Sequence, residues 1–258
     1  MHNIEMAEVS EDFARCWNAA GLSIQNQAQG PLQSWLRAHL NPPFLEHLSF
    51  RLGNQLFYIQ IEDVDGVLET PGSLEGLLAI ADGCAGHACL MPMKRVGLDW
   101  EPTEGGWGLI DARTRMPVSP PALITDQNLV MTDWELQDLA VQVVRDQTAK
   151  EGHKLMSWNG DPGVNPSLWF VGPSGGPEWV IVRAVRYPLT QATEPANTAE
   201  LKSHFDKMGF PGHFASVAIA SADDPFDPDA ERNRNFIPLY RGCAMHIRYE
   251  GLRSLKAK

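Results

Sequence analysis

Two segments of the chain have the alternating pattern of a β-hairpin. In the first, apolar, β-branched and aromatic runs lie at 168–171 and 179–185, and the sequence PSGGP separates them. In the second, the sequence LSFRLGNQLFYIQIED at 48–63 shows the same pattern, with Gly53 and Asn54 at its turn. Strand-forming runs on either side of glycine, proline or asparagine are typical of antiparallel hairpins. The sequence therefore predicts one hairpin in each half of the chain.

Apolar residues at helical spacing predict helices before and after the hairpin at 48–63. A helix is expected at 11–20, after the N-cap Ser10 and before Gly21, and a second helix starts at Pro31 and ends near residue 40. After the hairpin, Ser73 is the expected N-cap of a helix at 74–83, whose buried face carries apolar residues at i, i+3, i+4 and i+7.

The second half repeats this arrangement. Thr132 and Glu135 form a capping box at the start of a helix that ends before Gly152. Its expected apolar stripe consists of Leu136, Leu139, Ala140, Val143 and Val144. Asn197 and Glu200 form a similar capping box for a helix that ends at Gly209.

The remaining strands complete two similar patterns. They are expected at 87–96 and 107–111 in the first half, and at 154–158, 214–220 and 244–249 in the second. Both halves place Gly-His between helix and strand, at 86–87 and 212–213. We therefore predict an α/β fold with a mixed sheet and two similar modules, 1–115 and 129–258, joined by a proline-rich linker at 116–128. An internal duplication explains this similarity, and so does a chance alternation of helices and strands.

The order α-β-β-β-α-β in the second half resembles the core of the PD-(D/E)xK phosphodiesterase fold, found in many nucleases. The resemblance covers residues 132–220. In that family a carboxylate closes the second strand, an acid-x-Lys element lies on the third, and a helix often adds a Glu; the acids hold a divalent metal such as Mg²⁺. Here the corresponding strands carry Asn165 and Ser167, then Ile181 and Arg183, and Glu135 already belongs to the capping box. The resemblance therefore implies a nuclease-like scaffold whose catalytic motif has degenerated.

Three residues are the remaining candidates for a catalytic site at this position: Asp161, Glu178 and Arg183. The plain interpretation of Asp161, which precedes a proline in a glycine-rich loop, is a turn residue. Glu178 is most simply a charge at the end of a strand. Four arginines, Arg183, Arg186, Arg241 and Arg248, are the candidates for binding phosphate or another acidic group.

Cysteine and histidine occur twice with the spacing of metal ligands. The pairs are Cys84 with His87 and Cys243 with His246, and four such ligands suit a structural zinc. The alternative is that the cysteines are packed thiols and the histidines ordinary polar residues. Otherwise we expect no cofactor.

Composition limits the classes of function. The net charge of −11 opposes indiscriminate binding to nucleic acid and to anionic membranes. Four cysteines in 258 residues do not form a disulfide framework, and the N-terminus lacks the pattern of a signal peptide. We therefore expect a cytoplasmic protein, although export without a cleavable signal stays an alternative.

Two charged segments near the C-terminus are candidates for contacts with partners. The acidic run SADDPFDPD at 221–229 lacks the glycine and the final glutamate of an EF-hand, so it is either a solvated loop or a docking site for a basic partner. The stretch 231–258 is basic, and it either binds an acidic partner or docks on the rest of the protein itself.

These observations favour a non-catalytic protein that binds a protein partner. The alternative is a metal-dependent nuclease, or a nucleic-acid-binding protein that uses its second module. A small-molecule enzyme of another family is a third interpretation.

Overall fold

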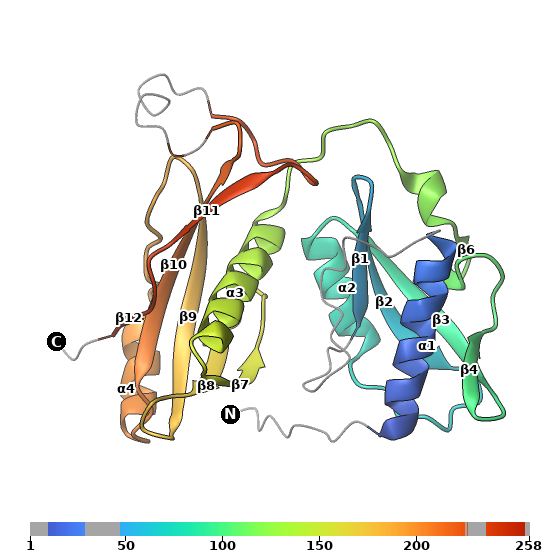
Figure 1. Ribbon diagram of the computed structural model, residues 1–258, viewed down its shortest axis with the longest axis horizontal. Coiled ribbons are helices and arrows are strands. Elements are labelled where there is room, and N and C mark those ends of the chain that lie inside the picture. The colour runs from blue at the N-terminus through green and yellow to red at the C-terminus, as the bar shows by residue number, and fades with distance from the viewer. Residues whose placement is uncertain (1–9, 29–46, 225, 227–235, 256–258) are drawn as a thin grey trace. The chain divides into compact units, whose positions relative to one another are not determined.

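The computed structural model describes residues 10–28, 47–224, 226 and 236–255 (Figure 1). The chain divides into two compact units, Met1–Gln127 and Asn128–Lys258. Each unit contains a mixed sheet of six strands with helices packed on it, which confirms the predicted α/β class and the two similar modules. Within the described ranges, no helix combines the length and the apolar character that a bilayer span requires.

Unit 1 is built around a sheet of order β1-β2-β3-β5-β6, with β4 also paired to β3. Strands β2 and β3 are parallel, and all other pairs are antiparallel. In chain order its elements are α1 (Glu11–Gln27), β1 (Leu48–Leu52), β2 (Gln55–Asp63), α2 (Leu74–Gly83), β3 (His87–Val96), β4 (Asp99–Pro102), β5 (Leu109–Asp111), β6 (Pro117–Val118) and the 3₁₀ helix η1 (Pro120–Leu123).

The core of unit 1 lies between α1 and one face of this sheet. Phe13, Trp17 and Ile24 of α1 join one buried cluster with side chains of β2 and β3. The prediction that the first helix ends at Gly21 is wrong, because the apolar stripe of α1 continues to Ile24. A glycine inside a helix costs only about 1 kcal/mol, which such packing offsets.

Unit 2 has a sheet of order β11-β10-β9-β8-β7, with β12 also paired to β10 (Figure 1). Strands β9 and β10 are parallel, and the other pairs are antiparallel. Its elements are α3 (Asp133–Lys150), β7 (Lys154–Trp158), β8 (Leu168–Val171), β9 (Pro177–Arg186), α4 (Thr198–Asp206), β10 (Gly212–Ser221), β11 (Met245–Tyr249) and β12 (Arg253–Ser254). Both predicted hairpins are therefore confirmed.

Two helices cover opposite faces of the sheet in unit 2. The α3 side buries Leu136, Ala140 and Val144 against β8, β9 and β10. On the other side Trp179, Ile181 and Phe214 form a second cluster, against which residues of α4 pack. The capping box of Thr132 and Glu135 is confirmed. The stripe of α3 is rotated from the predicted one, since Gln137 and Val141 are buried while Leu139 and Val143 are only half-buried.

The two units agree in the side chains that join their parallel strands. His87 lies opposite Phe57, and its Nε2 is 3.0 Å from Oε1 of Gln55, two residues before Phe57. In unit 2, His213 lies opposite Val180, and its Nε2 is 2.6 Å from Oε2 of Glu178, two residues before Val180. The sequence similarity at Gly-His thus corresponds to the same place in both sheets.

Some local details differ from the predictions. The segment 116–128, expected to be a linker, contains the boundary between the units at 127–128 but also β6 and η1. Before that boundary it packs on unit 1, where Ile124 lies over Gly53 and Asn54 donates to Thr125. Proline is compatible with edge strands and with the first turn of a helix, so the prolines did not exclude structure. Asn197 makes no side-chain cap, because its φ of −85° and ψ of 4° are not the extended backbone that capping needs. The helix expected from Pro31 lies outside the described residues.

The glycine before each histidine leaves room for an aromatic ring. A Cβ on Gly212 would lie 2.2 Å from Cζ2 of Trp179, and one on Gly86 would lie 2.9 Å from a ring carbon of Tyr58. Trp179 is fully buried and its indole N–H donates to the carbonyl oxygen of Phe210. The ring therefore has no room to withdraw.

We expect Gly212→Ala to lower the free energy of unfolding by about 1–3 kcal/mol, because overpacking displaces the indole of Trp179. Urea denaturation monitored by tryptophan fluorescence measures this loss. Gly176→Ala is the matched control, since a Cβ there meets only Oγ of Ser174 at 3.7 Å. Equal stability of the two variants would contradict the role of Gly212.

Candidate functional site

The site to which the resemblance points lies beside β9, at the position where β8 begins. Leu168, the first residue of β8, pairs with Val180, so β9 continues beyond β8 from Ile181 to Arg186. Backbone groups along this part of β9 lack a β8 strand partner, and buried backbone groups must find hydrogen bonds elsewhere. We call this place the β8–β9 notch and define it by Gln137, Asn165, Ser167 and Arg183.

Two neutral side chains complete the backbone hydrogen bonds of β9 in the notch. The backbone N–H of Val182 donates to Oγ of Ser167 at 3.2 Å. Nε2 of Gln137 donates to the carbonyl oxygen of Val182 at 2.8 Å, and the N–H of Ala184 donates to Oε1 of Gln137 at 3.1 Å. Ser167 and Gln137 are both buried. The amide of Gln137 thus takes the place of a peptide group of a neighbouring strand.

Arg183 is bound within the same notch. Its Nη1 donates to the carbonyl oxygen of Val182 and its Nη2 to Oδ1 of Asn165, both at 2.7 Å. Desolvation by burial lowers the pKa of this guanidinium from its usual value. Ile181, at the position where the resemblance requires an acid, is fully buried on the α4 side of the sheet. The notch therefore holds amide, hydroxyl and guanidinium groups, and the expected acid position on β9 is apolar.

Glu135 is engaged at the start of α3. Its Oε2 accepts a hydrogen bond from the N–H of Thr132, and its two carboxylate oxygens accept from Arg241 at 2.9 and 3.0 Å. The exposed fractions of the Glu135 and Arg241 side chains are only 8% and 2%. This buried bidentate pair holds the segment before β11 against α3.

The other two candidate arginines also have partners in unit 2. Arg186 forms an ion pair with Asp133 at 3.0 Å and donates to the carbonyl oxygen of Met131. The guanidinium of Arg248 lies over the ring of Phe226, 4.6 Å from its centroid. All four arginines that were candidates for binding therefore make contacts within unit 2.

Asp161 and Glu178 are placed apart from the notch contacts. Oδ1 of Asp161 accepts from the N–H of Gly163 at 2.7 Å, which is the turn role expected from the sequence. Glu178 is not a solvated strand end, because its side chain is 10% exposed and bonded to His213. Glu178 and Arg183 are five residues apart on β9, so their side chains point to opposite faces.

The Cys/His candidates do not form a ligand cluster. Cys84 caps α2 and is buried, His87 contacts Gln55 at the start of β3, and His246 is exposed on β11. The two Cys-x-x-His pairs belong to different units. Among the described residues, there is no group of three or more His, Cys, Asp or Glu side chains that could hold a metal ion.

The sequence predicted the positions of the notch but missed Gln137. The sequence feature that could have indicated Gln137 is a polar residue directly beside Leu136, on the buried side of a capped, amphipathic helix. A glutamine in that position also occurs on solvated helix faces, and only its contact with β9, 45 residues away, shows its role.

Residues 134–255, from the second residue of α3 to just after β12, match the family model described as "Domain of unknown function (DUF8840)". No curated protein sequence and no solved structure matches the chain.

We expect Gln137→Leu to lower the free energy of unfolding by about 1–3 kcal/mol, because it removes the partner of the buried N–H of Ala184 and one of the two side-chain donors to the carbonyl oxygen of Val182. Urea denaturation followed by circular dichroism measures the change. Gln142→Leu on the same helix is the control, since the half-buried Gln142 donates to the side chain of Asp138 within the helix and not to the backbone of β9. An equal effect of both substitutions would show that Gln137 has no special role.

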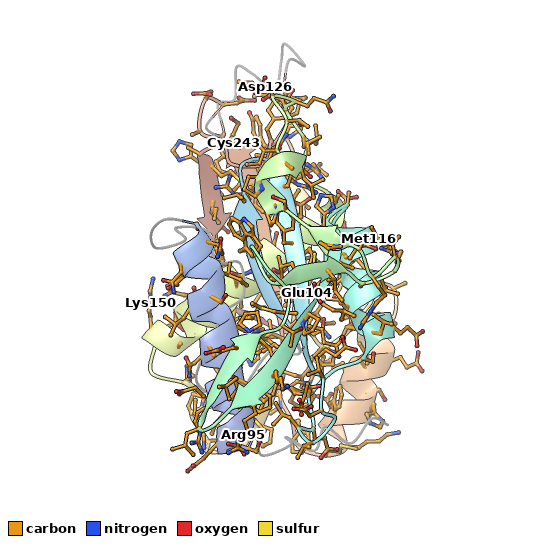
Figure 2. The ribbon with its side chains drawn as sticks, turned by 90° about the vertical axis from the view of Figure 1, so that its right-hand side faces the viewer. Arg95, Glu104, Met116, Asp126, Lys150 and Cys243 are labelled. Atoms are coloured by element: carbon orange, nitrogen blue, oxygen red, sulfur yellow. The ribbon has the colours of Figure 1, made fainter. Side chains whose placement is uncertain are left out.

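Thiol reactivity should separate Cys243 from the other cysteines. Desolvation raises the pKa values of Cys16 and Cys89 to about 12, and the carboxylates of Asp63 and Asp111 add to these shifts. A raised pKa lowers the thiolate fraction near pH 8, and the thiolate is the reactive form. Cys84 is buried, whereas Cys243 is half-buried in the loop before β11 (Figure 2).

We therefore expect one rapidly labelled thiol per native chain at pH 8 and four after denaturation, measured by mass spectrometry with a maleimide. Cys243→Ser should abolish the rapid phase. Rapid labelling of Cys16 or Cys89 in the folded protein would contradict the burial of these thiols.

Proposed function

We propose that unit 2 is a non-catalytic module that binds a protein partner, on a scaffold similar to that of the PD-(D/E)xK phosphodiesterases. The order α3–β7–β8–β9–α4–β10 supports the similarity, with β9 and β10 parallel and β7, β8 and β9 successively antiparallel. The observation that carries the proposal is the occupied β8–β9 notch, in which Gln137, Ser167 and Arg183 bond to the backbone of β9.

The hydrogen bonds that fill the β8–β9 notch oppose phosphodiester cleavage. Metal-dependent cleavage needs carboxylates that project from neighbouring strands to hold the ion and the scissile phosphate. In the notch the side-chain oxygens of Asn165, Ser167 and Gln137 already accept hydrogen bonds from unit 2 itself. An arriving metal ion would have to break these contacts and would find neutral ligands.

The charges support a protein partner over nucleic acid. The chain has a net charge of −11, which repels a polyanion. Arg186 and Arg241, two of the arginines that were candidates for binding, are paired with Asp133 and Glu135. Binding a phosphate would therefore compete with existing ion pairs.

We also propose that the two units arose by internal duplication. Their cores place a helix, an antiparallel hairpin, a second helix and a parallel strand in the same order. Ser49 and Ser167 support this correspondence, since both are buried and both lie on the first strand of the hairpin or directly before it.

The free thiol state of all four cysteines fits a reducing compartment, and we place the protein in the cytoplasm.

The nuclease alternative is tested directly with the full chain. We expect no cleavage of labelled single- or double-stranded DNA or RNA in the presence of Mg²⁺ or Mn²⁺, because the notch supplies no acidic ligand pair. Cleavage that requires the metal and is lost in Asp161→Asn or Glu178→Gln would overturn the proposal.

Protein binding is tested by affinity capture from the native host, followed by reconstitution of the pair from purified components. We expect the captured partner to remain bound after nuclease digestion and to bind again in a titration calorimeter. A partner that is released by nuclease digestion, or that fails to bind when purified, would contradict protein recognition.

A further inference from the structure

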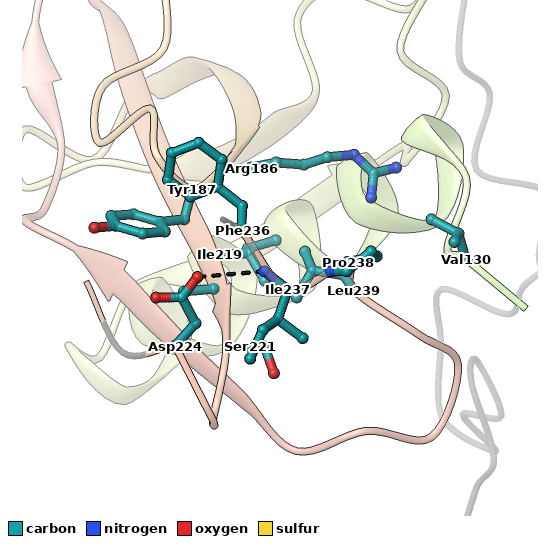
Figure 3. A pocket seen from close by; sticks show the side chains of 11 residues that line it. Val130, Arg186, Tyr187, Ile219, Ser221, Asp224, Phe236, Ile237, Pro238 and Leu239 are labelled. Carbon is teal, nitrogen blue, oxygen red and sulfur yellow. Dashed lines mark hydrogen bonds between the residues drawn. The ribbon is translucent and has the colours of Figure 1, made fainter. Parts of the chain in front are cut away.

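Unit 2 contains a cavity of about 220 Å³ beyond the carboxyl ends of its two parallel strands (Figure 3). Arg186 and Tyr187 at the end of β9 line it, as do Ile219 to Ser221 at the end of β10. In open α/β sheets, ligands bind preferentially outside the carboxyl ends of parallel strands. This cavity is separate from the β8–β9 notch, since none of Gln137, Asn165, Ser167 and Arg183 lines it.

A buried carboxylate lines the cavity, and no described cationic side chain is paired with it. Asp224 is 7% exposed, and its Oδ2 accepts one long hydrogen bond, from the N–H of Ile237 at 3.4 Å. An ionised carboxylate can accept about four hydrogen bonds, and burying one without compensation is costly. In the described part of the chain, no Lys, Arg or His forms an ion pair with Asp224.

Arg186 does not meet this need, although it lines the same cavity. Its guanidinium extends toward Val130, on the side away from Asp224 (Figure 3). There it is held by the carboxylate of Asp133 and the carbonyl oxygen of Met131. Among the described residues, the carboxylate of Asp224 is therefore left without a cationic partner.

The aromatic rings near Asp224 suit the same kind of ligand. The ring of Tyr187 contacts Phe236 at 5.6 Å and Phe226 at 5.5 Å, both edge to face. Aromatic faces attract ammonium and guanidinium groups, and Arg248 already occupies the face of Phe226 in this manner. A carboxylate beside aromatic rings is a site for an organic cation.

The rim of the cavity favours a side chain of a protein over a free amine. Val130 and Ile237 line the cavity and remain 49% and 41% exposed, so they present apolar surface around its opening. Such surface can cover the aliphatic stem of a lysine or arginine and the neighbouring residues of a partner.

We propose that this cavity binds the charged end of a lysine or arginine side chain from a partner protein, with Asp224 as its counter-ion. The inference rests on the proposed function, because it names the chemistry by which unit 2 recognises its partner.

The test uses the full chain and three blocked amino acids, N-acetyl-lysine methylamide, N-acetyl-arginine methylamide and the neutral N-acetyl-norleucine methylamide. We expect saturable binding of the lysine or arginine compound, followed by NMR chemical shifts, and no saturation with norleucine. Asp224→Asn keeps the shape and the acceptor for Ile237 but removes the charge, so we expect affinity to fall about 10-fold or more. Phe236→Leu should weaken binding about threefold.

Asp223→Asn is the matched control, because Asp223 is the exposed neighbour of Asp224 and does not line the cavity. We expect it to leave the affinity unchanged, and thermal melts of all variants check their folding. Equal binding by wild type and Asp224→Asn would overturn the proposal, as would a lack of saturation with both cationic compounds. Binding of free agmatine but of neither blocked amino acid would overturn the assignment to a protein side chain.

A failure of the cavity-binding test can be distinguished from a failure of the proposed function. If the cationic compounds fail to bind while the partner protein still binds independently of nucleic acid, the binding module stands and the Asp224 cavity is not its contact. If metal-dependent cleavage appears, the proposed function fails whatever the cavity binds.

Discussion

The close approach of two parallel strands at a Gly-His step is the constraint on which each unit depends. In unit 2 the absence of a Cβ at Gly212 admits the buried indole of Trp179 at the start of the β9–β10 pair, and in unit 1 Gly86 admits Tyr58. Parallel strands need a crossover, and α4 and α2 supply it while covering one face of each sheet. The histidine that follows each glycine then bonds to the preceding strand, which ties the start of one strand to the start of the next.

Once β9 is fixed beside β10, its other edge determines what the notch can do. Because β8 begins opposite Val180, the backbone of β9 beyond that point needs partners from side chains. Gln137 reaches it from α3 and Ser167 from the chain just before β8. A carboxylate in place of Gln137 could not donate to the carbonyl of Val182. The neutral amide of Gln137, which both donates and accepts, is therefore needed to stabilise this edge of the sheet.

Local patterns predicted most of the elements, since hairpins, capped helices and buried strands depend on neighbours in sequence. The structure departs from local predictions where a long-range contact determines the conformation. The first helix continues past Gly21 because Ile24 reaches the core. The segment around Ile124 and Thr125 is held by contacts with Gly53 and Asn54. The candidate site shows the same limit. The lack of acids at Asn165 and Ile181 was visible in the sequence, but the hydrogen bonds of the notch join residues up to 47 positions apart.

The balance of charges within unit 2 indicates which kind of partner it lacks. Arg183, Arg186 and Arg241 each have an oxygen partner in unit 2, so the module already satisfies these cations. Asp224 is the opposite case, a buried carboxylate that accepts a hydrogen bond from the backbone N–H of Ile237 and forms no ion pair with any described residue. A ligand that supplies negative charge must displace an existing partner, whereas a ligand that supplies positive charge adds one. The same asymmetry that disfavours a phosphate in the notch therefore favours a cationic side chain at the ends of β9 and β10.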